Sequence, residues 1–318
     1  MIRAWQADGA GAREVSAVDA IRHACSGPGM VWIDLQGEDE ATARALIAPL
    51  GIHPVAMDDV VAHINRPKVD DYGAYLYVAV HSARWEPDGR PTLRELDMLM
   101  GERFLVTFHD AATRSVSAAH TVLARRPELL ARGPAHLMHF LLDVLVDHYL
   151  PITEQIAADI DELEEKMFGP EQQPLDQSVL RLKRGLSALR RIIGPQRDTV
   201  MALTRDEVCA IPPEVRPYLR DVYDRLARVN DLLDSFRDEA ATLLDLHVAI
   251  VSKRLNEVTK VLTVIATIML PLTVVTGYYG MNFHLPEYAW RWGWLYALGL
   301  LVATAFGTWW YLRKRRWY

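Results

Sequence analysis

Cysteine is scarce in this chain, and several common functional motifs are missing. The 318 residues include two cysteines, Cys25 and Cys209, which are far apart and belong to no Cys-X-X-Cys pair. A disulfide framework and a thiolate metal site are therefore excluded, and both side chains are expected to be buried. The sequence has no glycine-rich phosphate loop followed by Lys-Ser/Thr and no dinucleotide fingerprint. We expect neither ATP coupling nor an organic cofactor, and no nucleophile and base pair indicates an enzyme.

An excess of positive charge is also missing. The formal net charge is −6, which argues against a nucleic-acid partner. The first residues, MIRAWQADGA, lack the basic start and apolar core of a secretory signal. The N-terminal part is therefore expected to stay in the cytoplasm.

Two runs without charged side chains stand near the C-terminus, residues 261–279 and 294–312. At a rise of ~1.5 Å per residue, each covers ~28 Å, about one hydrocarbon thickness of a bilayer. Basic residues precede the first run (Lys253, Arg254, Lys260) and follow the second (Arg313 to Arg316), whereas the connection holds Glu287 and Arg291. The positive-inside rule then places both termini in the cytoplasm and the connection outside, as in a multi-pass protein of the plasma (inner) membrane. Buried core helices of a soluble protein are the alternative.

The rest of the chain divides into an α/β part and a helical part. Alternating apolar residues predict strands at 30–35, 74–83, 93–100 and 103–109, with helices at 38–50 and 54–64. Helical periodicity then covers 135–169 and 175–203, around the loop PEQQP. After the breakers at 211–217, one helix of ~60 residues, roughly 90 Å long, runs into the first span.

The predicted fold class is an α+β membrane protein with a cytosolic α/β domain and a stalk helix continuous with the first of two C-terminal transmembrane helices. Its parts are an α/β domain (1–112), a helical hairpin (113–214), a stalk (215–260), span 1 (261–279), an external loop (280–293), span 2 (294–312) and a basic tail (313–318).

One face of the long helix carries a regular stripe. Aspartate recurs every seven residues at Asp224, Asp231, Asp238 and Asp245, and the same count continues through Ser252, Thr259, Ala266, Thr273 and Gly280. Small and hydroxyl-bearing residues are usual packing contacts between spans, and a solvated face explains the aspartates. An aligned aspartate ladder below the span instead favours a cation path.

Two spans per chain cannot enclose a pore, so a path of this kind requires several copies around an axis. Neighbours at helical spacing complete the predicted lining: Asn256, Thr259, Leu262, Ala266, Leu270, Thr273 and Gly277. Apolar rings at Leu262 and Leu270 can gate such a path by excluding water.

The stretch GYYGMNF, Gly277 to Phe283, follows this face. Its triplet Gly280-Met281-Asn282, at the outer end of the first of two C-terminal spans, resembles the signature of the CorA magnesium and cobalt transporters. The likeness covers essentially the whole chain: NEVTKVLTVIATIMLPLTVVT is similar to the family's pore helix, LPEYAWRWGW to its acidic loop, RKRRWY to its basic tail, and RPKVDDYGAYLYV and YLRDVYDRLARVNDLLDSFRDEAATLLDLH to its cytosolic domain and stalk.

The resemblance implies a homopentamer in membrane lipid, with a funnel-shaped cytosolic domain, a pore lined by the first span and an outer ring of second spans. Gly280, Met281 and Asn282 would form the selectivity filter, with the Asn282 amides facing a hydrated ion. By this likeness, six of the predicted lining residues fall at the family's pore positions: Asn256, Thr259, Leu262, Leu270, Thr273 and Gly277. Where the family commonly has a methionine near the inner end of the pore, this chain has Thr259, and Leu270 likewise departs from the family's pattern. The gate would therefore rest on Leu262.

The resemblance also implies divalent-ion sites between neighbouring cytosolic domains that inhibit transport. Asp221 matches the stalk position of such a site, and Asp88 is the candidate partner, although an aspartate before Gly89 is also typical of a β-turn. Asp245 and Glu287 would attract cations at the inner and outer mouths. His136 and His139 share one helix face and could bind zinc, but a third ligand is lacking and a structural role is favoured.

The expected function is therefore passive transport of Mg²⁺, together with Co²⁺ or Ni²⁺, with Mg²⁺ as both cargo and regulator. The membrane potential supplies the drive, at about 4.6 kcal/mol per 100 mV for a divalent ion. The alternatives are a zinc transporter of the same architecture and a membrane-anchored metal sensor that does not conduct.

Overall fold

The computed structural model describes residues 1–8, 11–26, 29–62, 66–168, 176–206, 208, 210–281 and 286–315. The described chain forms two compact units, Met1–Leu244 and Asp245–Tyr318. The long helix α9, Arg216–Tyr279, begins in the first unit and ends in the second.

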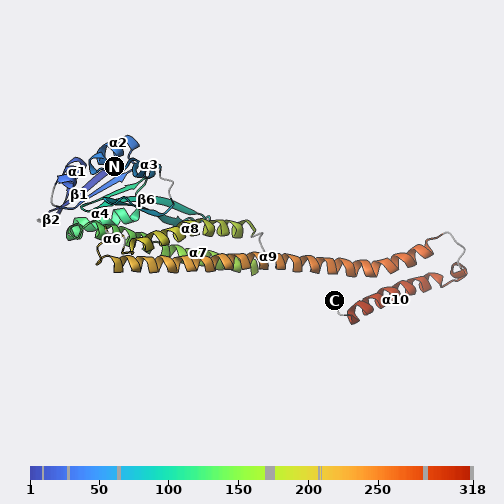
Figure 1. Cartoon of the computed structure of the whole chain (residues 1–318). Helices are drawn as coiled ribbons and strands as arrows, with labels where there is room; N and C mark the ends of the chain where they lie inside the picture. Colours follow the sequence, from blue (N-terminus) through green and yellow to red (C-terminus); the bar gives the residue numbers. More distant parts are fainter. Residues whose placement is uncertain are drawn as a thin grey trace. The chain divides into compact units, whose positions relative to one another are not determined.

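A mixed seven-stranded sheet forms the centre of the first unit, with strand order β2-β1-β3-β7-β6-β5-β4 (Figure 1). Strands β3 and β7 pair in parallel and the other neighbours pair antiparallel. The strands are β1 (Ile2–Asp8), β2 (Gly11–Val15), β3 (Val31–Gln36), β4 (Lys68–Asp71), β5 (Tyr75–Trp85), β6 (Pro91–Gly101) and β7 (Phe104–His109). The four predicted strands are confirmed. Strands β1, β2 and β4 were not predicted. The edge strands β2 and β4, GAREV and KVDD, have little apolar pattern to bury.

The pleat of the sheet separates two buried faces. Val31, Ile33 and Leu35 of β3 pack into one core with the helices α1 (Ala17–Ser26), α2 (Glu40–Ile47) and α3 (Pro54–Ala62). The alternate residues Trp32 and Asp34 are also buried, so they lie on the other face. Helices α4 (Arg114–Arg125), α5 (Glu128–Ala131), α6 (Pro134–Asp147), α7 (Tyr149–Phe168) and α8 (Asp176–Leu203) cover that second face (Figure 1).

The predicted helical run 135–169 is two helices, because α6 ends at Asp147 and α7 begins at Tyr149. Pro151 provides the reason, since it has no N–H to donate to the carbonyl of Asp147. A buried polar contact fixes α7 at this break: the hydroxyl of Tyr149 donates to the carbonyl oxygen of His81 on β5 at 2.7 Å. The loop PEQQP lies outside the described residues.

The first half of α9 buries one side against the helices of the first unit. The buried residues recur at spacings of three and four: Leu219, Val222, Leu226, Val229, Leu233, Phe236, Ala240 and Leu243. Ion pairs flank this side, with Arg190 of α8 on Asp234 at 2.6 Å and Arg225 of α9 on Asp143 of α6.

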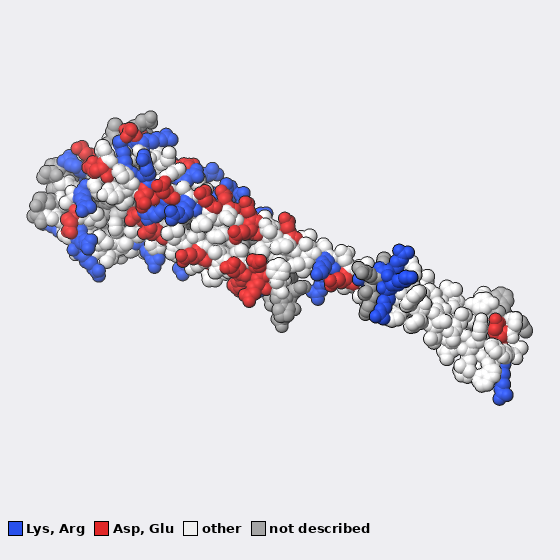
Figure 2. Space-filling view, turned by 90° about the horizontal axis from the view of Figure 1, so that it is seen from below, with Lys and Arg blue, Asp and Glu red and all other residues white. Residues whose placement is uncertain are grey.

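The second unit contains the end of α9, the short helix η2 (Pro286–Ala289) and helix α10 (Gly293–Lys314). Both α9 and α10 are long and apolar enough to cross a membrane. Of the most apolar 18-residue stretch of each helix, 0% is buried in α9 and 6% in α10. Figure 2 shows this unit as an uncharged stretch with charged groups at its two ends. The α/β domain, the long helix and the two apolar C-terminal helices agree with the predicted fold class.

Candidate functional site

The heptad stripe of α9 is exposed along its whole length. Its nine members are all solvent-exposed in the single chain: Asp224, Asp231, Asp238, Asp245, Ser252, Thr259, Ala266, Thr273 and Gly280. The buried residues of the first half of the helix lie on other faces. No aspartate of the ladder is used in an ion pair among the residues described, so its carboxylates are available to solvent cations.

The predicted lining residues within the span share this exposure. Asn256, Thr259, Leu262, Ala266, Leu270, Thr273 and Gly277 are all exposed. Leu262 and Leu270 expose 65% and 71% of their surface. Residues on another side are half-buried instead: Val264, Ile268, Pro271, Leu272 and Val275. The predicted lining face is therefore exposed in the single chain, as are all residues from 251 to 262 and several other residues of the span.

Threonine hydroxyls in the span are turned to the helix backbone. Thr263 donates to the carbonyl of Thr259 at 2.8 Å, and Thr273 donates to that of Met269 at 2.9 Å. A hydroxyl that donates inward keeps its lone pairs outward, so it can accept a hydrogen bond from water. Helix α9 continues through Pro271, which cannot donate to the carbonyl of Thr267.

The triplet begins immediately after α9. The N–H of Gly280 donates to the carbonyl of Thr276 at 2.9 Å, and a Cβ added at Gly280 would lie 3.1 Å from that oxygen. The glycine therefore permits close approach of the backbone as the helix ends. Met281 is 49% exposed, and Asn282 lies outside the described residues.

Glu287 follows in η2 and is half-buried. Its Oε2 is buried without a hydrogen-bond partner among the described residues. Gly293 allows η2 to pack closely on the start of α10, because a Cβ there would lie 2.1 Å from the Glu287 carbonyl oxygen. This close turn fixes the backbone position of Glu287.

Asp221 and Asp88 have separate partners in one chain. Asp221 is exposed and lies 3.0 Å from Arg225, which also pairs with Asp143 and Asp147 of α6. Asp88 lies in the turn between β5 and β6, where its Oδ1 accepts from the backbone N–H of Arg90 at 3.2 Å and Gly89 has a φ of 76°. The β-turn role of Asp88 is therefore present, and a site that joins Asp88 of one copy to Asp221 of another remains a prediction.

The whole-chain pattern was compared with known proteins. The family described as CorA-like Mg²⁺ transporter protein matches residues 27–314. The chain belongs to this family. It is a family of membrane ion transporters, not of enzymes, and the predicted resemblance is confirmed.

Individual CorA-family relatives match over most of their length. The cobalt/magnesium transport protein CorA of Thermotoga maritima is 32% identical over 294 residues, covering 90% of this chain and 83% of that protein. The zinc transport protein ZntB of Enterobacter sp. is 27% identical over 322 residues, covering 99% and 95%. The fold matches the solved CorA magnesium transporter of Methanocaldococcus jannaschii with a TM-score of 0.88 at 19% identity, over 100% and 99% of the two chains.

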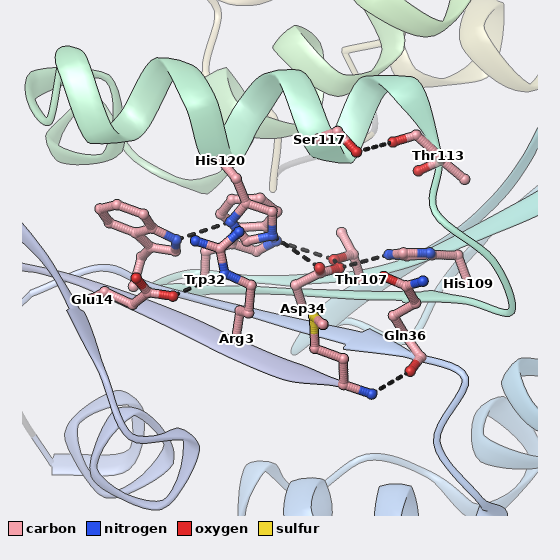
Figure 3. Close-up of polar contacts among 12 residues, drawn as sticks. Arg3, Glu14, Trp32, Asp34, Gln36, Thr107, His109, Thr113, Ser117 and His120 are labelled. Atoms are coloured by element: carbon pink, nitrogen blue, oxygen red, sulfur yellow. Dashed lines mark hydrogen bonds and ion pairs between the residues drawn. The ribbon is translucent and has the colours of Figure 1, made fainter.

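The sheet of this chain carries a buried polar cluster that sequence reasoning missed (Figure 3). Asp34 of β3 accepts hydrogen bonds from the Thr107 hydroxyl at 2.6 Å, His109 Nε2 at 3.0 Å and His120 Nε2 at 2.9 Å. Burial alone would raise the pKa of Asp34, but the hydrogen bonds from His109, His120 and Thr107 outweigh it and lower the pKa to about 2. Strands and a helix meet in this cluster, which links β3 and β7 to α4.

The hydrogen-bond partners define the protonation of both imidazoles. His109 faces two acceptors, Asp34 and the carbonyl of Ala111 at 2.9 Å from Nδ1, so its protonated form can donate from both ring nitrogens. Burial lowers the pKa of His109, but the hydrogen bond and charge of Asp34 raise it overall. His120 Nδ1 instead accepts from the indole N–H of Trp5 at 3.0 Å, so its Nε2 carries the proton.

This cluster does not have the chemistry of a metal site. A metal on His120 Nε2 would require a proton on Nδ1, where the Trp5 N–H already points. The Thr107 hydroxyl is fully buried, and the carboxylate to which it donates has a pKa of about 2, so Asp34 is too weak a base to activate it as a nucleophile. The cluster is a structural ion pair, and a buried Asp in the alternating pattern of a strand was the one sequence signal that could have revealed it.

The remaining candidates have little geometric support. Within the described ranges, no group of three or more His, Cys, Asp or Glu side chains could hold a metal ion. His139 stacks at a tilt on Tyr218, with centroids 5.4 Å apart, and burial lowers its pKa, which fits the structural role favoured for it and His136. Cys209 and the side chain of Cys25 lie outside the described part of the structure.

Proposed function

We propose that this protein conducts Mg²⁺ through a homopentamer whose path is lined by the exposed face of α9. The observation that carries the proposal is the continuity of that face, from the aspartate ladder through Thr259 and Thr273 to Gly280. A face that binds no other part of its own chain is available to face copies of itself around an axis. Family membership supplies the cation as cargo.

The chemistry of the face suits a hydrated divalent cation. Mg²⁺ holds its water tightly and prefers octahedral oxygen coordination. Rings of threonine hydroxyls and Asn282 amides accept hydrogen bonds from coordinated water without displacing it. A ring of carboxylates in the narrow part would bind the ion more firmly, and the aspartates instead stand below the span, where they raise the local cation concentration.

Closure of the path is assigned to two features. Leu262 and Leu270 form apolar rings that exclude water when the helices approach. Asp221 and Asp88 of neighbouring copies bind intracellular Mg²⁺ and hold the copies together, so a rise in internal Mg²⁺ stops transport. Both termini lie in the cytoplasm and the membrane potential drives influx.

Zinc transport is the second candidate, because the zinc transport protein ZntB matches nearly the whole chain. The two candidates share an architecture and differ in the ion. Uptake by purified protein in liposomes, measured for Mg²⁺, Co²⁺, Ni²⁺ and Zn²⁺ at zero and at imposed inside-negative potential, separates them. The proposal expects potential-dependent Mg²⁺ uptake.

The variant Asn282→Ala distinguishes a channel from a non-conducting sensor. The channel predicts loss of Mg²⁺ uptake or altered selectivity among the four ions. A sensor predicts that Asn282→Ala leaves all metal responses intact and that the wild-type protein conducts none of the ions. Potential-dependent Zn²⁺ uptake without Mg²⁺ uptake would favour the zinc candidate.

A further inference from the structure

A second site of opposite charge lies on the first unit, between α8 and α9. This cavity of about 610 Å³ is lined by five residues of α8 and two of α9: Ser187, Arg190, Arg191, Gly194, Arg197, Asn230 and Arg237. Four of the seven are arginines and none is acidic. Such a concentration of guanidinium groups is unexpected in a chain with a net charge of −6, and it points to an anion.

Two of the four guanidinium groups have carboxylate partners and two do not. Arg190 pairs with Asp234 at 2.6 Å and Arg197 with its neighbour Asp198 at 2.8 Å. Arg191 donates only to the backbone carbonyl of Ser187, at 3.3 Å. Arg237 has no hydrogen bond or ion pair with any residue in the described ranges. The pocket therefore retains uncompensated positive charge.

Asn230 supplies an independent sign of a ligand. Its side chain is on the inner wall of the cavity and the residue is 8% exposed. Its amide forms no hydrogen bond with the described part of the chain, and its polar atoms are not among the fully buried unpaired ones, so the amide faces the pocket. Across from it, a Cβ added at Gly194 would lie 3.8 Å from Asn230 Oδ1, so the glycine leaves the amide open to the cavity.

We propose that this cavity binds the phosphate group of a small molecule, either free phosphate or a nucleotide. Guanidinium groups bind phosphate oxygens with paired N–H donors, and the Asn230 amide adds a further donor from the floor. Phosphate offers acceptors in several directions, which suits arginines that converge from two helices better than a planar carboxylate does.

The site is distinct from the cation path. It lies beside the aspartate ladder on the same helix, because Arg237 precedes Asp238 directly and Asn230 precedes Asp231. A phosphate bound here would lower the positive charge next to those aspartates and strengthen cation attraction along the ladder. The inference thus adds an anionic ligand to a protein whose cargo is a cation.

Calorimetric titration of the full-length protein in detergent tests the proposal. Inorganic phosphate and ATP are titrated separately in EDTA, so that no nucleotide binds through protein-bound Mg²⁺. Binding of either ligand is expected, and the stronger of the two identifies the source of the phosphate group. Arg191→Gln and Arg237→Gln should each weaken binding at least tenfold, and Asn230→Leu should weaken it without loss of fold.

Arg184→Gln is the matched control, since Arg184 is an exposed arginine of α8 outside the cavity. This variant should bind as the wild type does. Absence of binding of both ligands at millimolar concentration would overturn the proposal, as would equal weakening by Arg184→Gln or full binding by Arg191→Gln and Arg237→Gln. The measurement uses neither Mg²⁺ nor flux, so its outcome does not depend on the transport proposal.

Discussion

Replacement of Asp34 by asparagine tests how the α/β domain is held together. The carboxylate is buried and its pKa is about 2, against 3.8 in the unfolded chain. That difference corresponds to about 2 kcal/mol of folding free energy near neutral pH. In Asp34→Asn the amide NH₂ would face an imidazole N–H or the Thr107 hydroxyl, and a buried donor without an acceptor adds a further cost of about 1–3 kcal/mol.

Hydrogen–deuterium exchange of the full-length protein measures this effect. Peptides from β3 and β7 should exchange at least thirtyfold faster in Asp34→Asn, which is roughly the equivalent of 2 kcal/mol. Asp39→Asn is the control, because exposed Asp39 caps α2 through an oxygen that asparagine retains. Exchange in β3 and β7 within threefold of the wild type would refute the assignment of Asp34 and His109 as a stabilising ion pair.

The pH dependence of the same ion pair has a defined sign. The folded pKa of Asp34 lies below its unfolded value, so its contribution is present above pH 3.8 and is lost as the pH falls toward about 2. The folded pKa of His109 lies above 6.5, so its contribution is present below pH 6.5 and is lost as the pH rises through the folded pKa. His109→Gln should therefore reduce the melting temperature more at about pH 5.5 than at about pH 9, and an equal reduction at both would contradict this.

Three further predictions concern the path, its control and the packing of α8. Asp221→Ala should abolish the inhibition of Mg²⁺ uptake by internal Mg²⁺ in liposomes. Its melting temperature should change little, because Arg225 keeps Asp143 and Asp147 as partners. Inhibition as strong as in the wild type would count against a role for Asp221. Leu262→Asn should raise uptake at high internal Mg²⁺ by wetting the apolar ring, and unchanged closure would remove Leu262 from the gate. Gly185→Val should destabilise the first unit by about 1–3 kcal/mol in thermal unfolding, since a Cβ there would lie 2.2 Å from the Gly89 carbonyl; an unchanged melting temperature would show that α8 shifts freely.

Helices and strands with a long, periodic residue pattern could be predicted from the sequence. The aspartate spacing predicted one side of α9 because a helix converts a heptad count directly into one side of a cylinder, and the four aspartates are exposed. The strands at β3, β5, β6 and β7 could be predicted because each buries an apolar pattern. Strand β1 was also missed, and the edge strands β2 and β4 could not be predicted, since their position depends on pairing with a neighbour and not on their own composition.

Contacts between distant segments were beyond sequence reasoning. Asp34, His109 and His120 are separated by up to 86 residues and meet only because β3 pairs in parallel with β7 beneath α4. The arginine cavity likewise requires the register of α8 against α9. The roles of Asp88 and Asp221 remain predictions, because a site shared by two copies is not encoded in the contacts of one chain.

The central claim is that one face of α9 lines the ion path, and cysteine modification tests it most directly. In a background with Cys25 and Cys209 replaced by serine, Thr273→Cys and Ile268→Cys place one thiol on the exposed face and one on the half-buried side. A charged, water-soluble thiol reagent is applied to protein in liposomes while Mg²⁺ uptake is recorded. The account predicts block of uptake in Thr273→Cys and no effect in Ile268→Cys. Block in Ile268→Cys with Thr273→Cys unaffected would contradict it.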